Sequence, residues 1–218
     1  MMDFLTPPGW DGSQSRLLWA INKVMNSPYE RLELAEYIGP HRKIREITGT
    51  GFAVLPDAFP PESVAGLRDY FSSRPVVAVD GCTNHIQPID VLKCDGVIEA
   101  ICKYQLFAKD CLGCEPVLAA AAAFWTMASG EQTGLNVWHR DRDDFRSVKV
   151  FIYLTPVNAK TGAHQFIKGT HLPGFPGQFY EGNCRSRAGE IQAYFKDMIH
   201  TFEGPAGFTW AEHTYGLH

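Results

Sequence analysis

Hydrophobic and polar positions follow a helical period through the first half of the chain. Apolar residues recur every three or four positions, and Gly39-Pro40 falls where the first helical stretch would end. Helices are predicted at residues 13–37, 62–71 and 97–112, with a short strand at residues 51–55. Residues 72–95 follow no clear period and are predicted to be irregular, apart from a candidate strand at 76–79.

The second half of the chain alternates between apolar and polar positions. In residues 148–155, one face holds Val148, Val150, Ile152 and Leu154, and the other holds Lys149, Phe151, Tyr153 and Thr155. Shorter strands are predicted at residues 124–126, 164–168, 200–202 and 208–211, a short helix at 190–195 and a surface excursion at 172–187. This pattern is typical of an α+β fold in which helices pack on one side of an antiparallel double-sheet barrel.

The chain is predicted to form a single domain over residues 1–218. It contains no internal repeat, low-complexity tract or linker. Within this domain, residues 1–48 are expected to form a helical N-terminal extension and residues 116–218 the barrel core.

Composition and charge narrow the function classes. Hydrophobic residues make up 45% of the chain, charged residues 20%, and the formal net charge is −4, as in ordinary globular domains. There is no basic tract, which argues against nucleic acid or a membrane as a partner. The N-terminus lacks a signal-peptide pattern, and the longest apolar run, 117–125, is far too short to cross a bilayer. We therefore expect a cytoplasmic protein with a small-molecule substrate, of unknown oligomeric state.

The six cysteines include Cys111 and Cys114 in a C-x-x-C arrangement. A redox site of this type needs a strand before the pair and a helix after it, and a zinc site needs a second pair. The sequence offers neither, so free thiols are expected.

The stretch from Trp138 to Asp141 contains the candidate chemistry. Residues two apart on a strand point to the same face, so an imidazole nitrogen of His139 and a carboxylate oxygen of Asp141 can reach one metal ion. With a distant histidine they would form the two-His-one-carboxylate set that suits non-haem Fe(II) and leaves coordination positions open. Arg140 would then point away and be structural.

The third ligand is expected among the later histidines. His164 and His171 come early in the barrel for this role, and His200 remains open. His213 and His218 lie at the end of the last predicted strand, where the barrel would return to its first strand. The residues alone leave these alternatives open.

Five stretches resemble, in order, the phytanoyl-CoA dioxygenase family of Fe(II)- and 2-oxoglutarate-dependent oxygenases. They are residues 51–62, 138–141, 148–157, 162–171 and 204–218. The resemblance implies a double-stranded β-helix, or jelly-roll barrel, that uses Fe(II), 2-oxoglutarate and O₂. It implies hydroxylation of a small organic molecule, with release of succinate and CO₂.

The resemblance also assigns residues. The family's strand ends in a Gly-Leu-His sequence, which implies His139, Asp141 and His218 as catalytic residues and metal ligands, with His213 in reserve.

Three residues of the long strand at 148–155 are candidates for binding the co-substrate. Tyr153 and Thr155 could bond its carboxylate, and Lys149 could balance its charge. The alternative is that these side chains only face a polar barrel interior.

One family feature falls outside the sequence. An Arg on the closing strand, beyond the distal His, would pair with the far carboxylate of 2-oxoglutarate. We expect the natural chain to continue past His218 and supply it; a degenerate site is the alternative.

Two other functions stay open. One is a metal-binding or inactive barrel that serves as a ligand-binding or interaction module. The other is a cupin-type site, for which the sequence lacks the usual His-x-His pair.

Overall fold

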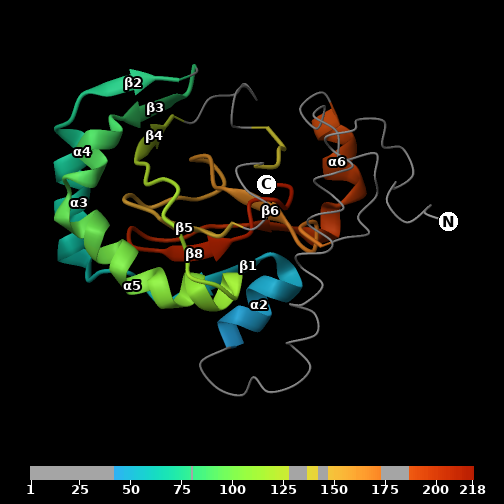
Figure 1. Ribbon diagram of the computed structural model, residues 1–218. Helices are drawn as coiled ribbons and strands as arrows, with labels where there is room; N and C mark the ends of the chain where they lie inside the picture. Colours follow the sequence, from blue (N-terminus) through green and yellow to red (C-terminus); the bar gives the residue numbers. More distant parts are fainter. Residues whose placement is uncertain (1–41, 80, 128–136, 142–146, 173–186) are drawn as a thin grey trace.

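The computed structural model describes residues 42–79, 81–127, 137–141, 147–172 and 187–218. These residues form a mixed structure of helices and antiparallel sheets (Figure 1). The helix predicted at residues 13–37 lies outside the described residues, as does nearly all of the surface excursion predicted at 172–187. No described helix is long and apolar enough to span a membrane.

The central sheet has the strand order β1-β8-β5 and is antiparallel. Its strands are β1 (Phe52–Leu55), β5 (Lys149–Ile152) and β8 (Thr209–Glu212). The last strand thus pairs with the first, as predicted from the sequence. In this register Glu212 lies between Phe52 and Lys149, so the three side chains share one face of the sheet.

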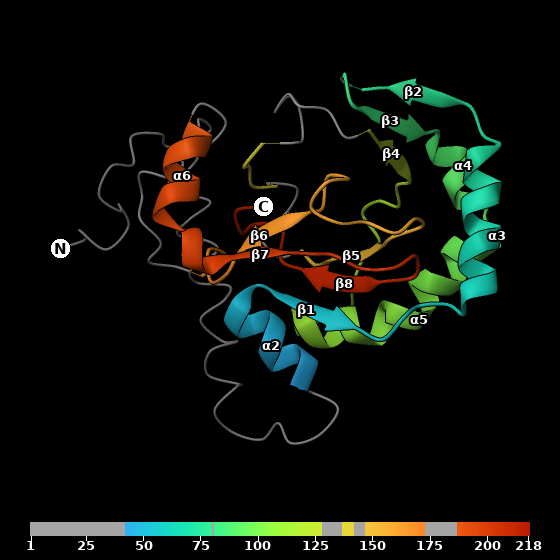
Figure 2. The same ribbon diagram turned by 180° about the vertical axis from the view of Figure 1, so that it is seen from behind.

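Three helices pack with the opposite face of the central sheet: α2 (Arg42–Thr50) and α5 (Asp95–Leu112) lie along it, and α3 (Pro61–Ser72) stands at one end of the strands (Figures 1 and 2). Their buried residues pack with Ala53, Leu55 and Ala211 of the sheet, and Val150 and Ile152 are partly buried against them. The alternation predicted for residues 148–155 is therefore observed, although β5 is shorter than expected.

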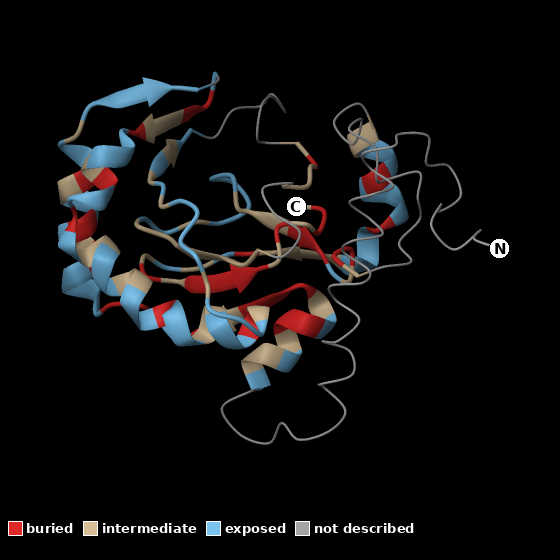
Figure 3. Ribbon diagram, viewed as in Figure 1, coloured by how far each residue is buried: buried red, intermediate tan, exposed pale blue. Residues whose placement is uncertain are grey.

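The face of the central sheet that bears Phe52, Lys149 and Glu212 packs on a second, smaller layer. This layer is the antiparallel pair of β6 (Gln165–Ile167) and β7 (Ile199–Thr201), seen beside the central sheet in Figure 2. Four buried aromatic residues fill the space between the layers: Phe52, Phe166, Phe202 and Trp210. All four residues of β8 are buried, and several residues near the C-terminus are buried as well (Figure 3).

Residues 72–79 and 81–95 contain more regular secondary structure than their sequence pattern indicated. They contain β2 (Val76–Ala78), β3 (Thr83–Ile86) and α4 (Pro88–Leu92). β3 pairs with β4 (Phe124–Thr126), a strand far along the chain. This partner explains the missed strand, because the local pattern of residues 83–86 does not include it.

Two short helices precede β7, namely α6 (Ala188–Tyr194) and the 3-10 helix η4 (Lys196–Met198).

The five cysteines among the described residues are free thiols, as expected, and these include both members of the C-x-x-C pair. Burial raises the pKa of Cys111 far above its usual value, which disfavours the reactive thiolate form.

Candidate metal centre

Residues 137–141 lie beside residues 214–218 and are held there by backbone hydrogen bonds. The His139 N–H donates to the His218 carbonyl at 2.9 Å, the His218 N–H donates to the His139 carbonyl at 3.0 Å, and the Asp141 N–H donates to the Thr214 carbonyl at 2.9 Å. The expected regular strand is not formed within the described residues 137–141. The physical reason is that the partner segment folds into a turn, closed by a bond from Gly216 N–H to the His213 carbonyl.

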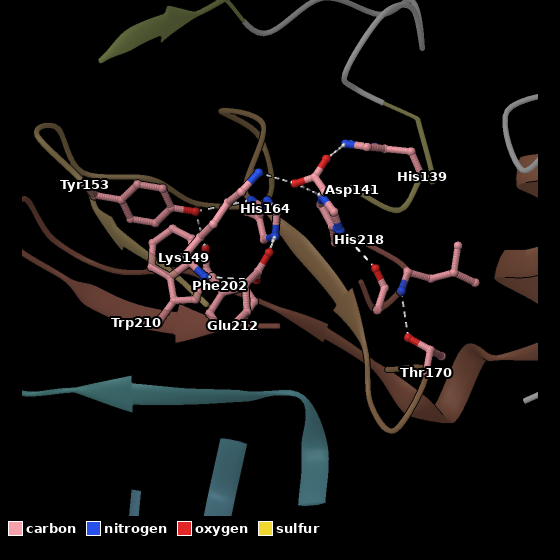
Figure 4. A network of polar contacts seen from close by, with 12 residues as sticks. His139, Asp141, Lys149, Tyr153, His164, Thr170, Phe202, Trp210, Glu212 and His218 are labelled. Carbon is pink, nitrogen blue, oxygen red and sulfur yellow. Dashed lines mark hydrogen bonds and ion pairs between the residues drawn. The ribbon is translucent and has the colours of Figure 1, made fainter. Parts of the chain in front are cut away.

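The side chains of His139, Asp141 and His218 converge on one point (Figure 4). His139 Nε2 is 3.7 Å from Asp141 Oδ1, and His218 Nε2 is 3.6 Å from Asp141 Oδ2. One ligand atom from each residue lies within 4.8 Å of the other two. The structure therefore brings together the three residues that the family resemblance implied.

The reserve candidate, His213, faces another direction. Its Nδ1 lies 2.9 Å from the Ser147 carbonyl, and its ring stacks on His171 with centroids 5.6 Å apart. His213 is also outside the group whose ligand atoms converge. These contacts favour His218 as the distal member of the set.

Backbone carbonyls hold the second ring nitrogen of both histidines in the group. His139 Nδ1 is 2.7 Å from the Val137 carbonyl, and His218 Nδ1 is 3.0 Å from the Gly216 carbonyl. A carbonyl can only accept, so the proton of each neutral ring is on Nδ1. The Nε2 lone pairs are then directed at the centre, which is the tautomer that a metal ligand needs.

The electrostatics of the centre also suit a cation. Burial raises the pKa of Asp141, but the hydrogen bond from Lys149 and the nearby charges of His218, Lys149 and His139 outweigh it and hold this pKa below its ordinary value. Burial lowers the pKa of His218 to about 4. At neutral pH the centre thus offers an ionised carboxylate and a neutral imidazole, the forms that bind metal. This donor set fits a divalent transition-metal ion with open coordination positions.

Of the three candidates for binding a co-substrate, Lys149 contacts the group directly. Its Nζ lies 2.5 Å from Asp141 Oδ2. Tyr153 Oη donates to the Phe202 carbonyl at 3.0 Å and accepts from the His164 N–H at 3.2 Å. Burial raises the pKa of Tyr153 to about 12, so the hydroxyl stays protonated. Thr155 is exposed, in the bend that follows β5.

Two neighbours of the ligand residues are structural. Arg140 Nη1 donates to the carbonyls of Thr170, at 2.7 Å, and of Tyr215, so its side chain points away as expected. Trp138 is buried in a separate apolar cluster with Ile167 and Leu217. It is a core residue.

A second polar pair lies beside the group, and sequence reasoning missed it. Glu212 is fully buried, and both its carboxylate oxygens lie 3.0 Å from His164 Nε2. Trp210 Nε1 donates to Glu212 Oε2 at 3.2 Å. Burial raises the pKa of Glu212, but the charge and hydrogen bond of His164 outweigh it and hold this pKa below its ordinary value. One signal was available, because Glu212 is a charged residue at the end of an otherwise uncharged strand.

Comparisons with known proteins bear on the fold. No family model matches the chain, and no curated protein matches it. Among solved structures, HygX from Streptomyces hygroscopicus, with nickel and 2-oxoglutarate bound, is similar, with a TM-score of 0.50 and 15% sequence identity. The match covers 84% of this chain and 80% of HygX. At this identity the likeness establishes the fold alone: the chain has the fold of a protein whose structure contains a metal ion and 2-oxoglutarate.

Proposed function

We propose that the protein is a non-haem Fe(II)- and 2-oxoglutarate-dependent dioxygenase. It would hydroxylate a small organic molecule, with release of succinate and CO₂, in a double-stranded β-helix of the phytanoyl-CoA dioxygenase type. The observation that supports this most is the convergence of His139, Asp141 and His218, whose ligand atoms lie within 4.8 Å of one another. The fold shared with HygX and the five family-like stretches, in order along the chain, add support.

The chain's own residues would hold the metal through two Nε2 atoms and one carboxylate oxygen. Bound Fe(II), together with 2-oxoglutarate, supplies the chemistry that activates O₂. The protein's part is geometry: the backbone bonds between His139 and His218 fix the two ligand residues relative to each other. Because Asp141 provides a carboxylate where a halide would otherwise need room, hydroxylation is proposed in preference to halogen transfer.

Lys149 has two roles in this proposal. Its ammonium holds Asp141 Oδ2, which orients the carboxylate towards the two histidines. It also places a positive charge on the inward face of β5, where a dianionic co-substrate would lie. Tyr153 supports the same region by tying β5 to the backbone at Phe202 and His164. That Tyr153 and Thr155 bond the co-substrate stays a prediction.

The test is succinate formation from 2-oxoglutarate by the protein supplied with Fe(II) and O₂, measured with and without candidate substrates. We expect His139→Ala to abolish turnover and His200→Leu, on β7, to retain it. Turnover that survives His139→Ala would refute the metal assignment. A protein that binds metal but shows no metal-dependent binding of 2-oxoglutarate would instead be a ligand-binding or interaction module.

A further inference from the structure

The outer face of α5 carries an exposed apolar stripe. Ile98 and Leu106 are 44% and 73% exposed, and Cys102 between them is exposed as well. These three residues are four positions apart, so they follow one side of the helix. By contrast, the exposed positions of α3, a helix that the structure describes in full, include no large apolar side chain. Single exposed apolar residues are ordinary, whereas a continuous stripe indicates a contact surface.

The packing of α5 within the chain uses its other side. The buried residues of the helix are Tyr104 and Cys111, which lie about 160–180° from Cys102 around the helix. Tyr104 Oη donates to the Pro56 carbonyl at 2.8 Å, which ties this buried side to the turn after β1. Exposed residues follow much of α5 in Figure 3. The apolar stripe therefore faces away from the core.

Charges of opposite sign lie at the two ends of the stripe. Asp95 is in the first turn of α5 and Lys109 in the last, and both are exposed. Each is seven residues from Cys102 and within about 20° of it around the helix. Lys109 also pairs with Glu115, but these side chains are 46% and 72% exposed. An exposed pair of this kind contributes little, so it leaves Lys109 able to take a further acidic partner.

Two copies of α5, packed antiparallel about a two-fold axis at Cys102, would match both the apolar and the charged positions. Each residue before Cys102 then faces the residue equally far beyond it in the second copy, so Ile98 faces Leu106. By the same rule Asp95 faces Lys109. A parallel pair would instead bring Asp95 to Asp95 and Lys109 to Lys109. Charge complementarity thus favours a second copy of this chain as the occupant, in the antiparallel direction.

Further apolar side chains lie beyond both ends of the stripe. Stable interfaces bury about 800 Å² on each partner, which is more than one pair of helices supplies. Exposed apolar residues come before α5, at Ile89 and Leu92, and after it, at Val117 and Leu118. Antiparallel packing brings the segment before α5 in one copy towards the segment after α5 in the other, which extends the contact.

We propose that the protein forms a two-fold symmetric homodimer in which α5 packs antiparallel against α5 of a second copy. This inference goes beyond the proposed function and does not depend on it. The interface lies on the outer side of the helices, whereas His139, Asp141 and His218 lie on the other side of the central sheet (Figures 1 and 4). Dimerisation therefore leaves the candidate metal centre uncovered.

Sedimentation equilibrium of the full chain is the first test. The chain has a mass of 24.3 kDa, and wild type should reach twice this mass as its concentration rises. Leu106→Glu would place a carboxylate of each copy in the apolar contact, so the dimer Kd should rise at least about tenfold. Val76→Glu is the matched control, because Val76 is 48% exposed on β2, and it should keep the wild-type Kd.

Three outcomes of this measurement overturn the proposal. One is wild type that stays monomeric, which would mean that something other than a second copy covers the stripe. Another is a dimer that Leu106→Glu leaves intact. The third is a dimer that Val76→Glu disrupts while Leu106→Glu does not, which would place the interface at β2.

Charge reversal separates the interface from folding. Asp95→Lys makes each end of its own dimer doubly basic, and Lys109→Glu makes each end doubly acidic, so each variant alone should dimerise more weakly than wild type. In a mixture of the two, both facing pairs are again of opposite sign. Native mass spectrometry should therefore detect heterodimer in excess of either homodimer. A mixture without this preference overturns the antiparallel arrangement.

Cys102 reports the position of the two-fold axis. A short bis-maleimide should join two copies through their Cys102 thiols, and Cys102→Ser should lose this product. Cys114→Ser is the control and should retain it, because Cys114 lies beyond the end of α5, where the two copies' thiols would be about 30 Å apart or more. Equal cross-linking of wild type and Cys102→Ser contradicts an axis at Cys102.

Discussion

The main chains of His139 and His218 exchange two hydrogen bonds, of 2.9 and 3.0 Å, one from each N–H to the other's carbonyl. This pairing brings the two rings to a centroid separation of 4.2 Å. The position of His218 in the centre therefore depends on the backbone of residues 214–218. Changes that shift this segment should reach the metal through His218.

The first prediction concerns the distal ligand. His218→Ala should lower the affinity for Ni(II) by more than about 100-fold. Mutating a residue that only hydrogen-bonds to a metal ligand already lowers metal affinity by about 10- to 100-fold, and loss of the ligand itself should cost more. His213→Gln is the matched control, since His213 faces the Ser147 carbonyl, and it should retain the wild-type affinity. Calorimetric titration with Ni(II) measures both. The reverse order of effects would make His213 the ligand.

Thr170 should hold the residue before the distal ligand. Its hydroxyl accepts the Leu217 N–H at 2.7 Å, donates to the Ile167 carbonyl at 2.7 Å, and is fully buried. Thr170→Val leaves the buried Leu217 N–H without this acceptor, which should lower the free energy of unfolding by about 1–3 kcal/mol and weaken Ni(II) binding. Thr170→Ser keeps the hydroxyl and should keep the Ni(II) affinity. Wild-type metal affinity in the Val variant would show that Thr170 does not position this segment.

Gly216 should tolerate no side chain. A Cβ atom there would lie 2.2 Å from Phe166 Cζ and 3.1 Å from Thr170 Oγ1, and Phe166 is fully buried. Gly216→Ala should destabilise the protein by about 1–3 kcal/mol, as overpacked cores do. Phe166→Leu removes the ring atoms that clash, so the double variant should be more stable than the sum of the two single changes predicts. Urea unfolding of the four proteins tests this, and simple additivity would contradict the clash.

The sequence predicted the parts of the site that depend on local spacing. His139 and Asp141 were found because they are two residues apart, and the inward face of β5 because its residues alternate. His218 needed the family resemblance, since spacing alone did not separate it from His213. The strand expected at residues 138–141 is not formed there, because its partner segment turns at residues 213–216.

Features that arise where distant segments of the chain meet could not be predicted from the sequence. His164 and Glu212 are 48 residues apart, and they meet because β6 packs over the central sheet. The charged residue at the end of β8 marks Glu212, but no local pattern pairs it with His164. β3 was missed for the same reason, since its partner β4 comes after the whole of α5. In both cases tertiary pairing decides what the local pattern leaves open.

The last prediction concerns pH and His171. This residue is 5% exposed, its Nε2 donates to the Thr48 carbonyl of α2 at 2.8 Å, and burial together with the charge of His213 lowers its pKa to about 3. In the unfolded chain its pKa is about 6.5. Between these values the unfolded state binds a proton that the folded state does not, so stability falls as pH decreases below about 6.5. The slope from this group is at most about 1.4 kcal/mol per pH unit.

His171→Gln keeps an N–H donor for Thr48 without a titrating group, and should flatten the pH dependence of the urea-unfolding free energy between about pH 6 and pH 4. Equal slopes for wild type and the variant would mean that His171 is protonated in the folded protein.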